Sequence, residues 1–83
     1  MRQASLKNAV FFGANLYNAH LEKADLTEAD LRSAKLSYAL LQHAKLNKAK
    51  LANAVLNHTD LRNAEMNYTQ FGTTTLADAK VDK

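Results

Sequence analysis

A large apolar residue occupies every fifth position of the chain, without a gap. The sixteen positions are Leu6, Phe11, Leu16, Leu21, Leu26, Leu31, Leu36, Leu41, Leu46, Leu51, Leu56, Leu61, Met66, Phe71, Leu76 and Val81. Two residues before each stands a small residue, which is Ala at thirteen positions and Thr at Thr59, Thr69 and Thr74. Residues five apart wind around an α-helix and alternate between the faces of a strand. The chain must therefore turn once in every repeat.

Turns that repeat in the same sense predict a β-solenoid, in which the large residues point inward and the repeats bury a core only by stacking. We expect all sixteen large residues to form the core. They fall into four inner ladders, Leu6/Leu26/Leu46/Met66, Phe11/Leu31/Leu51/Phe71, Leu16/Leu36/Leu56/Leu76 and Leu21/Leu41/Leu61/Val81. Phe11 and Phe71 lie in the first and last coils of one ladder, where we expect them to close the ends of the core.

The charged residues indicate how many repeats make one coil. If four repeats close a coil, residues twenty apart stack about 4.8 Å apart, where opposite charges are favoured. All seven charged pairs at this spacing are opposite in sign: Arg2/Glu22, Asp25/Lys45, Lys45/Glu65, Glu28/Lys48, Asp30/Lys50, Asp60/Lys80 and Arg62/Asp82. At a spacing of fifteen, five pairs are opposite and one is alike, and at twenty-five the tally is two and two. The charges favour four repeats per coil.

Residues 14–18 (ANLYN), 24–28 (ADLTE) and 29–33 (ADLRS) resemble the repeat of the pentapeptide-repeat family, which is written A(D/N)LXX. The resemblance extends from about Ala4 to Lys83, so we treat residues 1–83 as a single domain. It implies an all-β fold, a right-handed quadrilateral parallel β-helix of about four coils with four repeats each. Some members of this family resemble B-form DNA and inhibit or protect type II topoisomerases.

The two ends of the coil differ from its middle. No helical cap is apparent at either end, and a solenoid needs capping because its terminal rungs expose strand edges and core. Either the uncapped coils associate with another copy of the chain, or a larger chain covers them. We expect end-to-end homodimers that form through the uncapped coils. The three Thr substitutions lie in the C-terminal third, so we expect the last coil to be the least regular.

Composition and charge reduce the number of function classes that fit the chain. The chain has no cysteine, and its net charge is +3. A DNA mimic needs an acidic surface, so this balance disfavours a topoisomerase inhibitor, and the lack of a basic groove disfavours a nucleic-acid partner. No apolar run is long enough for a signal or membrane helix, so we expect a cytoplasmic protein without a membrane partner.

The outward positions hold the candidate functional residues. Tyr38, His58 and Asp78 fall in one outer ladder, with Asn18 below them and Tyr17 nearby. Our candidate interaction surface comprises Tyr17, Tyr38, His58 and Asp78, because tyrosines commonly anchor interfaces. A His over an Asp is typical of a general-base pair, but no nucleophile accompanies it, and we expect a convex surface without a ligand site. We expect no catalytic residue, cofactor or metal site. Asn47 and Asn67 are expected to form a structural amide ladder.

The sequence thus predicts a non-enzymatic structural or protein-interaction module, a rigid solenoid that presents ladders of side chains to an unknown protein partner. The alternative is a DNA-mimicking inhibitor or protector of gyrase, which the positive net charge disfavours.

Overall fold

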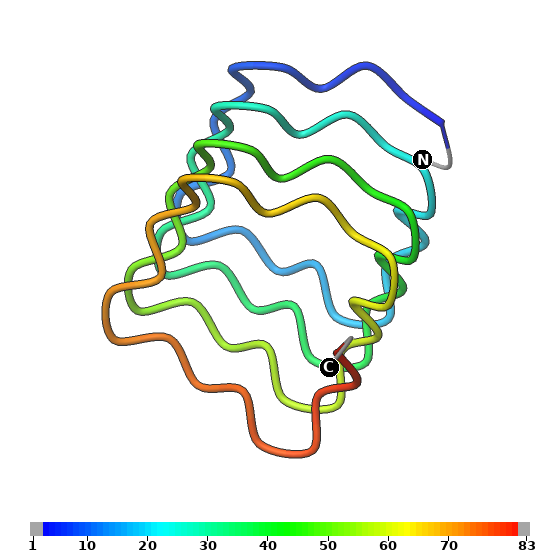
Figure 1. Cartoon of the computed structure of the whole chain (residues 1–83). Coiled ribbons are helices and arrows are strands. Elements are labelled where there is room, and N and C mark those ends of the chain that lie inside the picture. Colours follow the sequence, from blue (N-terminus) through cyan, green and yellow to red (C-terminus); the bar gives the residue numbers. More distant parts are fainter. Residues whose placement is uncertain (1–2, 82–83) are drawn as a thin grey trace.

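The computed structural model describes residues 3–81 as a stack of similar coils (Figure 1). Twelve parallel β-bridges each join residues twenty apart, so four pentapeptides make one coil, as the charges predict. The bridges form four ladders: Ser5/Asp25/Lys45/Glu65, Val10/Asp30/Lys50/Gln70, Asn15/Lys35/Val55/Thr75 and His20/Leu40/Asp60/Lys80. We call residues 5–24, 25–44, 45–64 and 65–81 the first to fourth coils.

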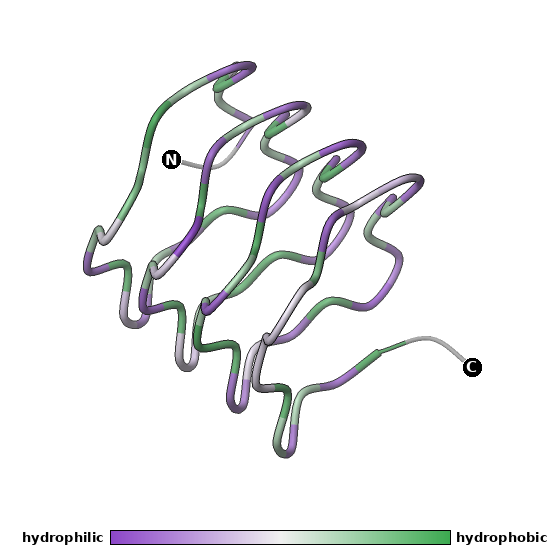
Figure 2. Ribbon diagram, turned by 90° about the vertical axis from the view of Figure 1, so that its left-hand side faces the viewer, coloured by the Kyte–Doolittle hydropathy of each residue, from purple (hydrophilic) through white to green (hydrophobic). Residues whose placement is uncertain are grey.

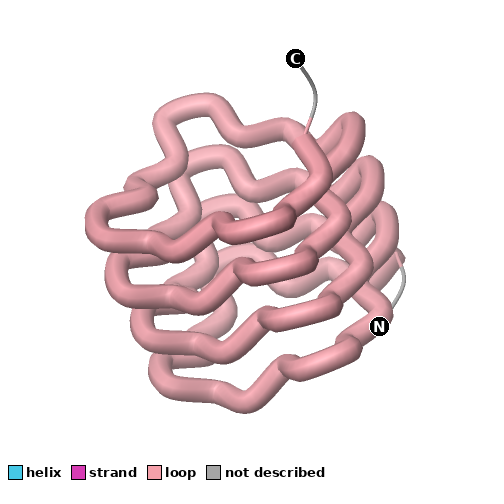
Figure 3. Tube along the Cα trace, turned by 90° about the horizontal axis from the view of Figure 1, so that it is seen from below, coloured by secondary structure: helices cyan, strands magenta, loops and turns pink. Residues whose placement is uncertain are grey.

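Each bridge pairs one residue of a coil with one residue of the next coil and extends no further. Across residues 3–81 there is neither a helix nor an extended strand, and the trace consists of turns and short connections (Figure 3). The expected parallel β pairing is therefore present only as isolated rungs. The physical reason is the repeat itself, because a chain that turns every five residues has no room for a longer strand.

The first three coils make four turns each with nearly the same geometry, and the described part of the fourth coil makes three. In one of them the N–H of Ala29 donates to the carbonyl of Leu26 at 3.0 Å, and Glu28 has a φ of 60°. A positive φ at the third residue is the mark of a type II turn. The same residues also bond to the next coil, because Leu26 N–H donates to Lys45 O at 2.7 Å and Glu28 N–H to Asn47 O at 2.9 Å. Each turn is thus stabilised by its neighbour in the stack.

Turns of the same kind lie above one another and form four corners of the stack. The first corner follows Leu6, Leu26, Leu46 and Met66; the second follows Phe11, Leu31, Leu51 and Phe71; the third follows Leu16, Leu36, Leu56 and Leu76; and the fourth follows Leu21, Leu41 and Leu61. The chain alternates between hydrophobic and hydrophilic stretches all the way around each coil (Figure 2). The whole stack measures 27 × 23 × 22 Å.

The core runs through the middle of this stack. Nine leucines are at most 1% exposed: Leu21, Leu26, Leu31, Leu36, Leu41, Leu46, Leu51, Leu56 and Leu61. The alanines between them, such as Ala29 and Ala39, are fully buried and leave room for the leucines. Burial of each leucine contributes roughly 1.5–3 kcal/mol, so stacking supplies most of the stability of the coil.

The prediction that all sixteen large residues form the core is wrong at the C-terminal end. Leu76 is 41% exposed and Val81 is 50% exposed, because no further coil of the described chain covers the fourth. Five other members of the set are partly buried and pack against the core: Leu6, Phe11, Leu16, Met66 and Phe71. The two phenylalanines thus cover the core from opposite ends, as the ladder predicts.

The fourth coil is also the least regular, as expected. In its second turn the positive φ moves from the third residue to the second, Gly72, at 51°. Thr74 replaces the usual alanine there, and its hydroxyl donates to the carbonyl oxygens of Leu51 and Phe71. A Cβ atom added to Gly72 would lie 3.0 Å from Ala52 Cβ, so only glycine fits this close approach between coils.

Candidate interaction surface

The third corner carries the predicted candidate residues. Tyr38, His58 and Asp78 occupy the third position of successive turns, with φ values of 63°, 62° and 58°. Tyr17 occupies the second position of the turn below them. Tyr38, His58 and Asp78 share this positive φ and stack on successive rungs, and Tyr17 lies at the same corner. The corner therefore presents four side chains in a row.

Contacts between these side chains are direct. The rings of Tyr17 and Tyr38 meet edge to face, with centroids 5.6 Å apart. The rings of Tyr38 and His58 stack with centroids 4.7 Å apart and planes 8° apart. His58 Nε2 lies 3.7 Å from Asp78 Oδ2. All four predicted residues thus come together, and we call them the aromatic ladder.

The aromatic ladder is rigid but open to solvent. Tyr17 is 56% exposed and Tyr38 is 48% exposed. The backbone beneath is fixed, because Asn57 Oδ1 accepts a hydrogen bond from the N–H of Ala77 at 3.2 Å. Pre-stacked rings lose little freedom when a partner covers them, which favours binding. The geometry suits contact with another surface.

The fourth corner contains a feature that the sequence analysis missed. Its outward side chains line an open groove of about 960 Å³, formed by Gln3, Glu22, Lys23, Gln42, His43, Arg62 and Asn63. We call it the fourth-corner groove. The expectation of a uniformly convex surface is therefore wrong. Long polar side chains at positions 22, 42 and 62 were the available signal, because three of them stacked at one corner can enclose space.

Residues 3–81 contain no group of three or more His, Asp or Glu side chains that could hold a metal ion. Within the same range no helix is long and apolar enough to cross a membrane.

The sequence profile of the pentapeptide repeats matches residues 4–42 and 39–78, with eight copies. The chain belongs to the pentapeptide-repeat family. This profile describes a structural repeat and not a catalytic domain. No curated protein has a significant match to the chain.

Solved structures of pentapeptide-repeat proteins resemble this one. Rfr23 from the cyanobacterium Cyanothece 51142 is 32% identical with a TM-score of 0.56, over 100% of this chain and 60% of Rfr23. A trypsin-treated form of QnrB1, described as a plasmid-mediated fluoroquinolone resistance protein, is 24% identical with a TM-score of 0.54, over 89% of this chain and 38% of QnrB1. At this identity the likeness to QnrB1 concerns the fold alone.

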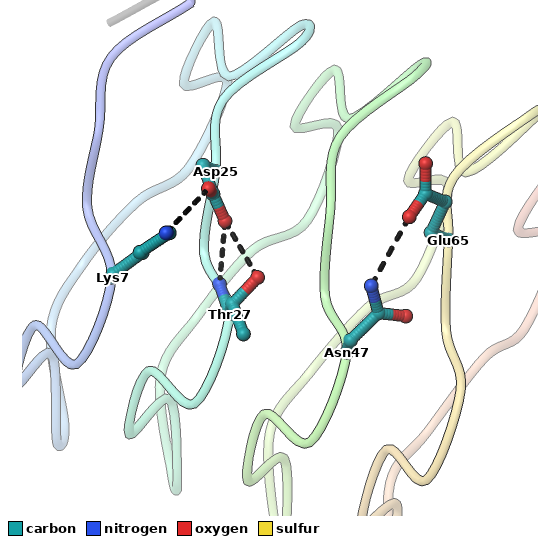
Figure 4. A network of polar contacts seen from close by, with 5 residues as sticks. All are labelled: Lys7, Asp25, Thr27, Asn47 and Glu65. Carbon is teal, nitrogen blue, oxygen red and sulfur yellow. Dashed lines mark hydrogen bonds and ion pairs between the residues drawn. The ribbon is translucent and has the colours of Figure 1, made fainter.

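The charges of this pentapeptide-repeat protein stack in the predicted register but make different contacts. Five of the seven predicted pairs lie wholly within residues 3–81, and the other two include Arg2 or Asp82, which lie outside them. Among the described residues none of these five pairs forms a direct ion pair. Lys7 instead reaches Asp25 Oδ2 at 3.9 Å, and Asp25 Oδ1 accepts from the Thr27 hydroxyl at 2.6 Å (Figure 4). Hydrogen bonds from the side chain and the backbone of Thr27 lower the pKa of Asp25, and the charges of Lys7 and Lys45 lower it further.

Two aspartates are bound by an arginine of the following turn. Arg32 Nε and Nη2 each donate to the carboxylate of Asp30 at 2.8 Å. Arg62 Nε and Nη2 likewise donate to the carboxylate of Asp60, at 2.9 and 2.7 Å. The bonds from Arg32 lower the pKa of Asp30 to about 2, and those from Arg62 lower the pKa of Asp60. These acids stay charged and are tied to the protein itself.

The predicted amide ladder at the first corner takes another form. Asn47 Oδ1 accepts from the backbone N–H of Asn67 at 2.9 Å. Asn47 Nδ2 donates to Glu65 Oε1 at 3.1 Å (Figure 4). The two amide side chains are therefore not bonded to each other. Asn47 still has the structural role that was expected, because it joins two coils.

Proposed function

We propose that this pentapeptide-repeat protein is a non-enzymatic module that binds a protein partner through its aromatic ladder. The observation that supports this most is the unbroken contact from Tyr17 through Tyr38 and His58 to Asp78 on an exposed corner. Exposed tyrosines on a rigid frame are the residues that most often dominate protein interfaces. The right-handed sense of the coil and a cytoplasmic location stay predictions.

The shape of the aromatic ladder also fits a protein better than a small molecule. The ring faces of Tyr38 and His58 already stack on each other, with planes 8° apart. A partner therefore meets the ring edges and the Tyr hydroxyls along a line several rungs long. Such a line matches an extended surface and does not enclose a compact ligand.

The experiment compares two tyrosines that share the same backbone geometry. Tyr38 and Tyr68 both sit at the third position of a turn, with φ values of 63° and 59°, but Tyr68 lies on another corner and is 85% exposed. The immobilised protein is used to capture proteins from a lysate of its source. We expect Tyr38→Ala to lose a captured protein that Tyr68→Ala retains. Equal capture by both variants would contradict the proposal.

We further propose that the ends of the stack contact a second copy of the chain. Among residues 3–81, six of the seven large apolar residues that are exposed lie in the first or the fourth coil: Val10, Phe12, Tyr17, Tyr68, Leu76 and Val81. In sedimentation experiments the chain should associate as its concentration rises, and Leu76→Lys should weaken this association. Val55→Lys, in the third coil, is the control. A monomer at every concentration argues against end-to-end contact.

The alternative, a DNA-mimicking protein that acts on gyrase, has less support. The net charge is +3, whereas a mimic of DNA must present negative charge to a cationic site. Asp30 and Asp60 are moreover bound by arginines, which neutralises them locally. A gyrase supercoiling assay separates the two functions, because inhibition at a low protein concentration would favour the alternative.

A further inference from the structure

The fourth-corner groove lies away from the aromatic ladder, and nothing in the proposed function uses it. Its lining comes from successive rungs, with Glu22, Gln42 and Arg62 in one column and Lys23, His43 and Asn63 in the column beside it. Rungs are spaced about 4.8 Å apart. The volume of about 960 Å³ is in the range of sites that hold small molecules. The groove therefore offers several polar groups at regular intervals.

Two acceptor oxygens of this groove are shielded from solvent. Glu22 Oε1 and Gln42 Oε1 are both fully shielded, although each residue as a whole is partly exposed. The other oxygen of Glu22, Oε2, lies 3.5 Å from His20 Nδ1. For Gln42 this leaves the Nε2 group, which is a donor, as the end of the amide that can meet a ligand. One oxygen of each of these two side chains is thus hidden from a ligand in the groove.

Hydrogen-bond donors make up most of the remaining lining of the groove. Lys23 contributes an ammonium group one rung before His43, and Gln42 contributes its side-chain N–H groups on the rung of His43. Arg62 supplies a guanidinium at the far end, of which Nε and Nη2 are bonded to Asp60. The lining holds two cations, Lys23 and Arg62, and one anion, Glu22, and Asp60 offsets the charge of Arg62. Cationic donors in a recess select an anion with several acceptor oxygens.

We propose that the fourth-corner groove is a binding site for a small dicarboxylate. One carboxylate meets the Lys23 ammonium, and the other accepts from Gln42 Nε2 and the His43 ring on the next rung. A ligand with two carboxylates is favoured over a ligand with one, because the donors of the groove repeat from rung to rung. This site is independent of the aromatic ladder, so either proposal can fail alone.

The test uses two probes of the same shape that differ in charge. Succinate carries two carboxylates, and succinamide replaces both with neutral amides. Both are titrated into the isotope-labelled protein while NMR spectra record the backbone amides and the side-chain N–H₂ of Gln42. We expect succinate to shift residues 22–23 and 42–43 with a dissociation constant on the order of 1 mM, as suits a few exposed charged bonds. Succinamide should leave them unshifted, and equal shifts from both probes would overturn the proposal.

Inorganic phosphate is the second comparison. It is an oxyanion without two separated carboxylates. We expect it to bind at least fivefold more weakly than succinate, because it can meet only one rung at a time. Phosphate that binds as tightly as succinate would overturn the dicarboxylate assignment.

Variants then locate the site. Gln42→Glu replaces the donor with a like charge in the same space and should weaken succinate binding at least tenfold. Lys23→Gln should weaken it about fivefold, whereas the control Lys48→Gln, which has the same φ of 62° at another corner, should have no effect. Unchanged binding in Lys23→Gln overturns the proposal, even if Gln42→Glu proves too unstable to measure.

Discussion

The third coil and the fourth coil are built from the same repeat, yet they differ in the burial of their large residues and in the regularity of their turns. In the third coil Leu46, Leu51, Leu56 and Leu61 are at most 1% exposed, and every turn has its positive φ at the third residue. In the fourth coil Leu76 and Val81 are 41% and 50% exposed, and one turn is displaced. The difference teaches that a repeat does not have a stability of its own. Its neighbours on both sides supply most of it.

The largest expected effect compares two leucines of one ladder. Leu36→Ala removes a fully buried side chain and should lower the free energy of unfolding by about 2–5 kcal/mol. Leu76→Ala makes the same change in the fourth coil, where the leucine is 41% exposed, and should cost about 1 kcal/mol or less. Urea denaturation of both variants measures the difference. Equal losses would mean that the fourth coil is packed as tightly as the second.

A smaller effect is expected at the two glycines. Gly13 and Gly72 both have a positive φ, of 68° and 51°, so an alanine at either should cost roughly 1–2 kcal/mol of backbone strain. Gly72→Ala should cost more, because its new Cβ would lie 3.0 Å from Ala52 Cβ, whereas nothing lies within 4 Å at Gly13. Thermal melting of both variants tests this. A greater loss from Gly13→Ala would show that contact between the coils does not restrict Gly72.

Acid should destabilise the second coil while the pH is still above the pKa of Asp30. Arginine bonds hold that pKa at about 2, below the ordinary value of 3.8, so the folded state favours the charged form. The stability that this adds is complete above about pH 4 and is lost as the pH falls toward 2. Asp30→Asn should flatten the dependence of the melting temperature on pH across this window. A slope identical to that of the unchanged protein would exclude Asp30 as its source.

The smallest expected effect is a gain. Lys48 in the third coil has a φ of 62°, a conformation that asparagine adopts more readily than lysine. Lys48→Asn should therefore stabilise the protein by about 0.5 kcal/mol, as measured by urea denaturation. A loss of stability of similar size would indicate that Lys48 makes contacts that stabilise the protein more than the removal of its backbone strain does.

Much of the fold could be predicted because the repeat is strict. The spacing of five identifies the inward positions, and the signs of the charges at a spacing of twenty identify the rungs that stack. The same arithmetic brings Tyr17, Tyr38, His58 and Asp78 to one corner. The contacts could not be predicted, because a side chain chooses among several partners within reach. Asp30 lies on the rung beside Lys50 but is bound by Arg32 in its own turn.

By itself the sequence determined the length of the repeat, the number of repeats per coil and the residues that share a corner, since all three follow from periodicity. Only the tertiary structure decided which of the large residues are buried, because burial of Leu76 and Val81 depends on whether another coil covers them. It also decided that the side chains of the fourth corner enclose a groove. That outcome depends on the directions of Glu22 and Gln42, which are set by their neighbours in space and not by their place in the repeat.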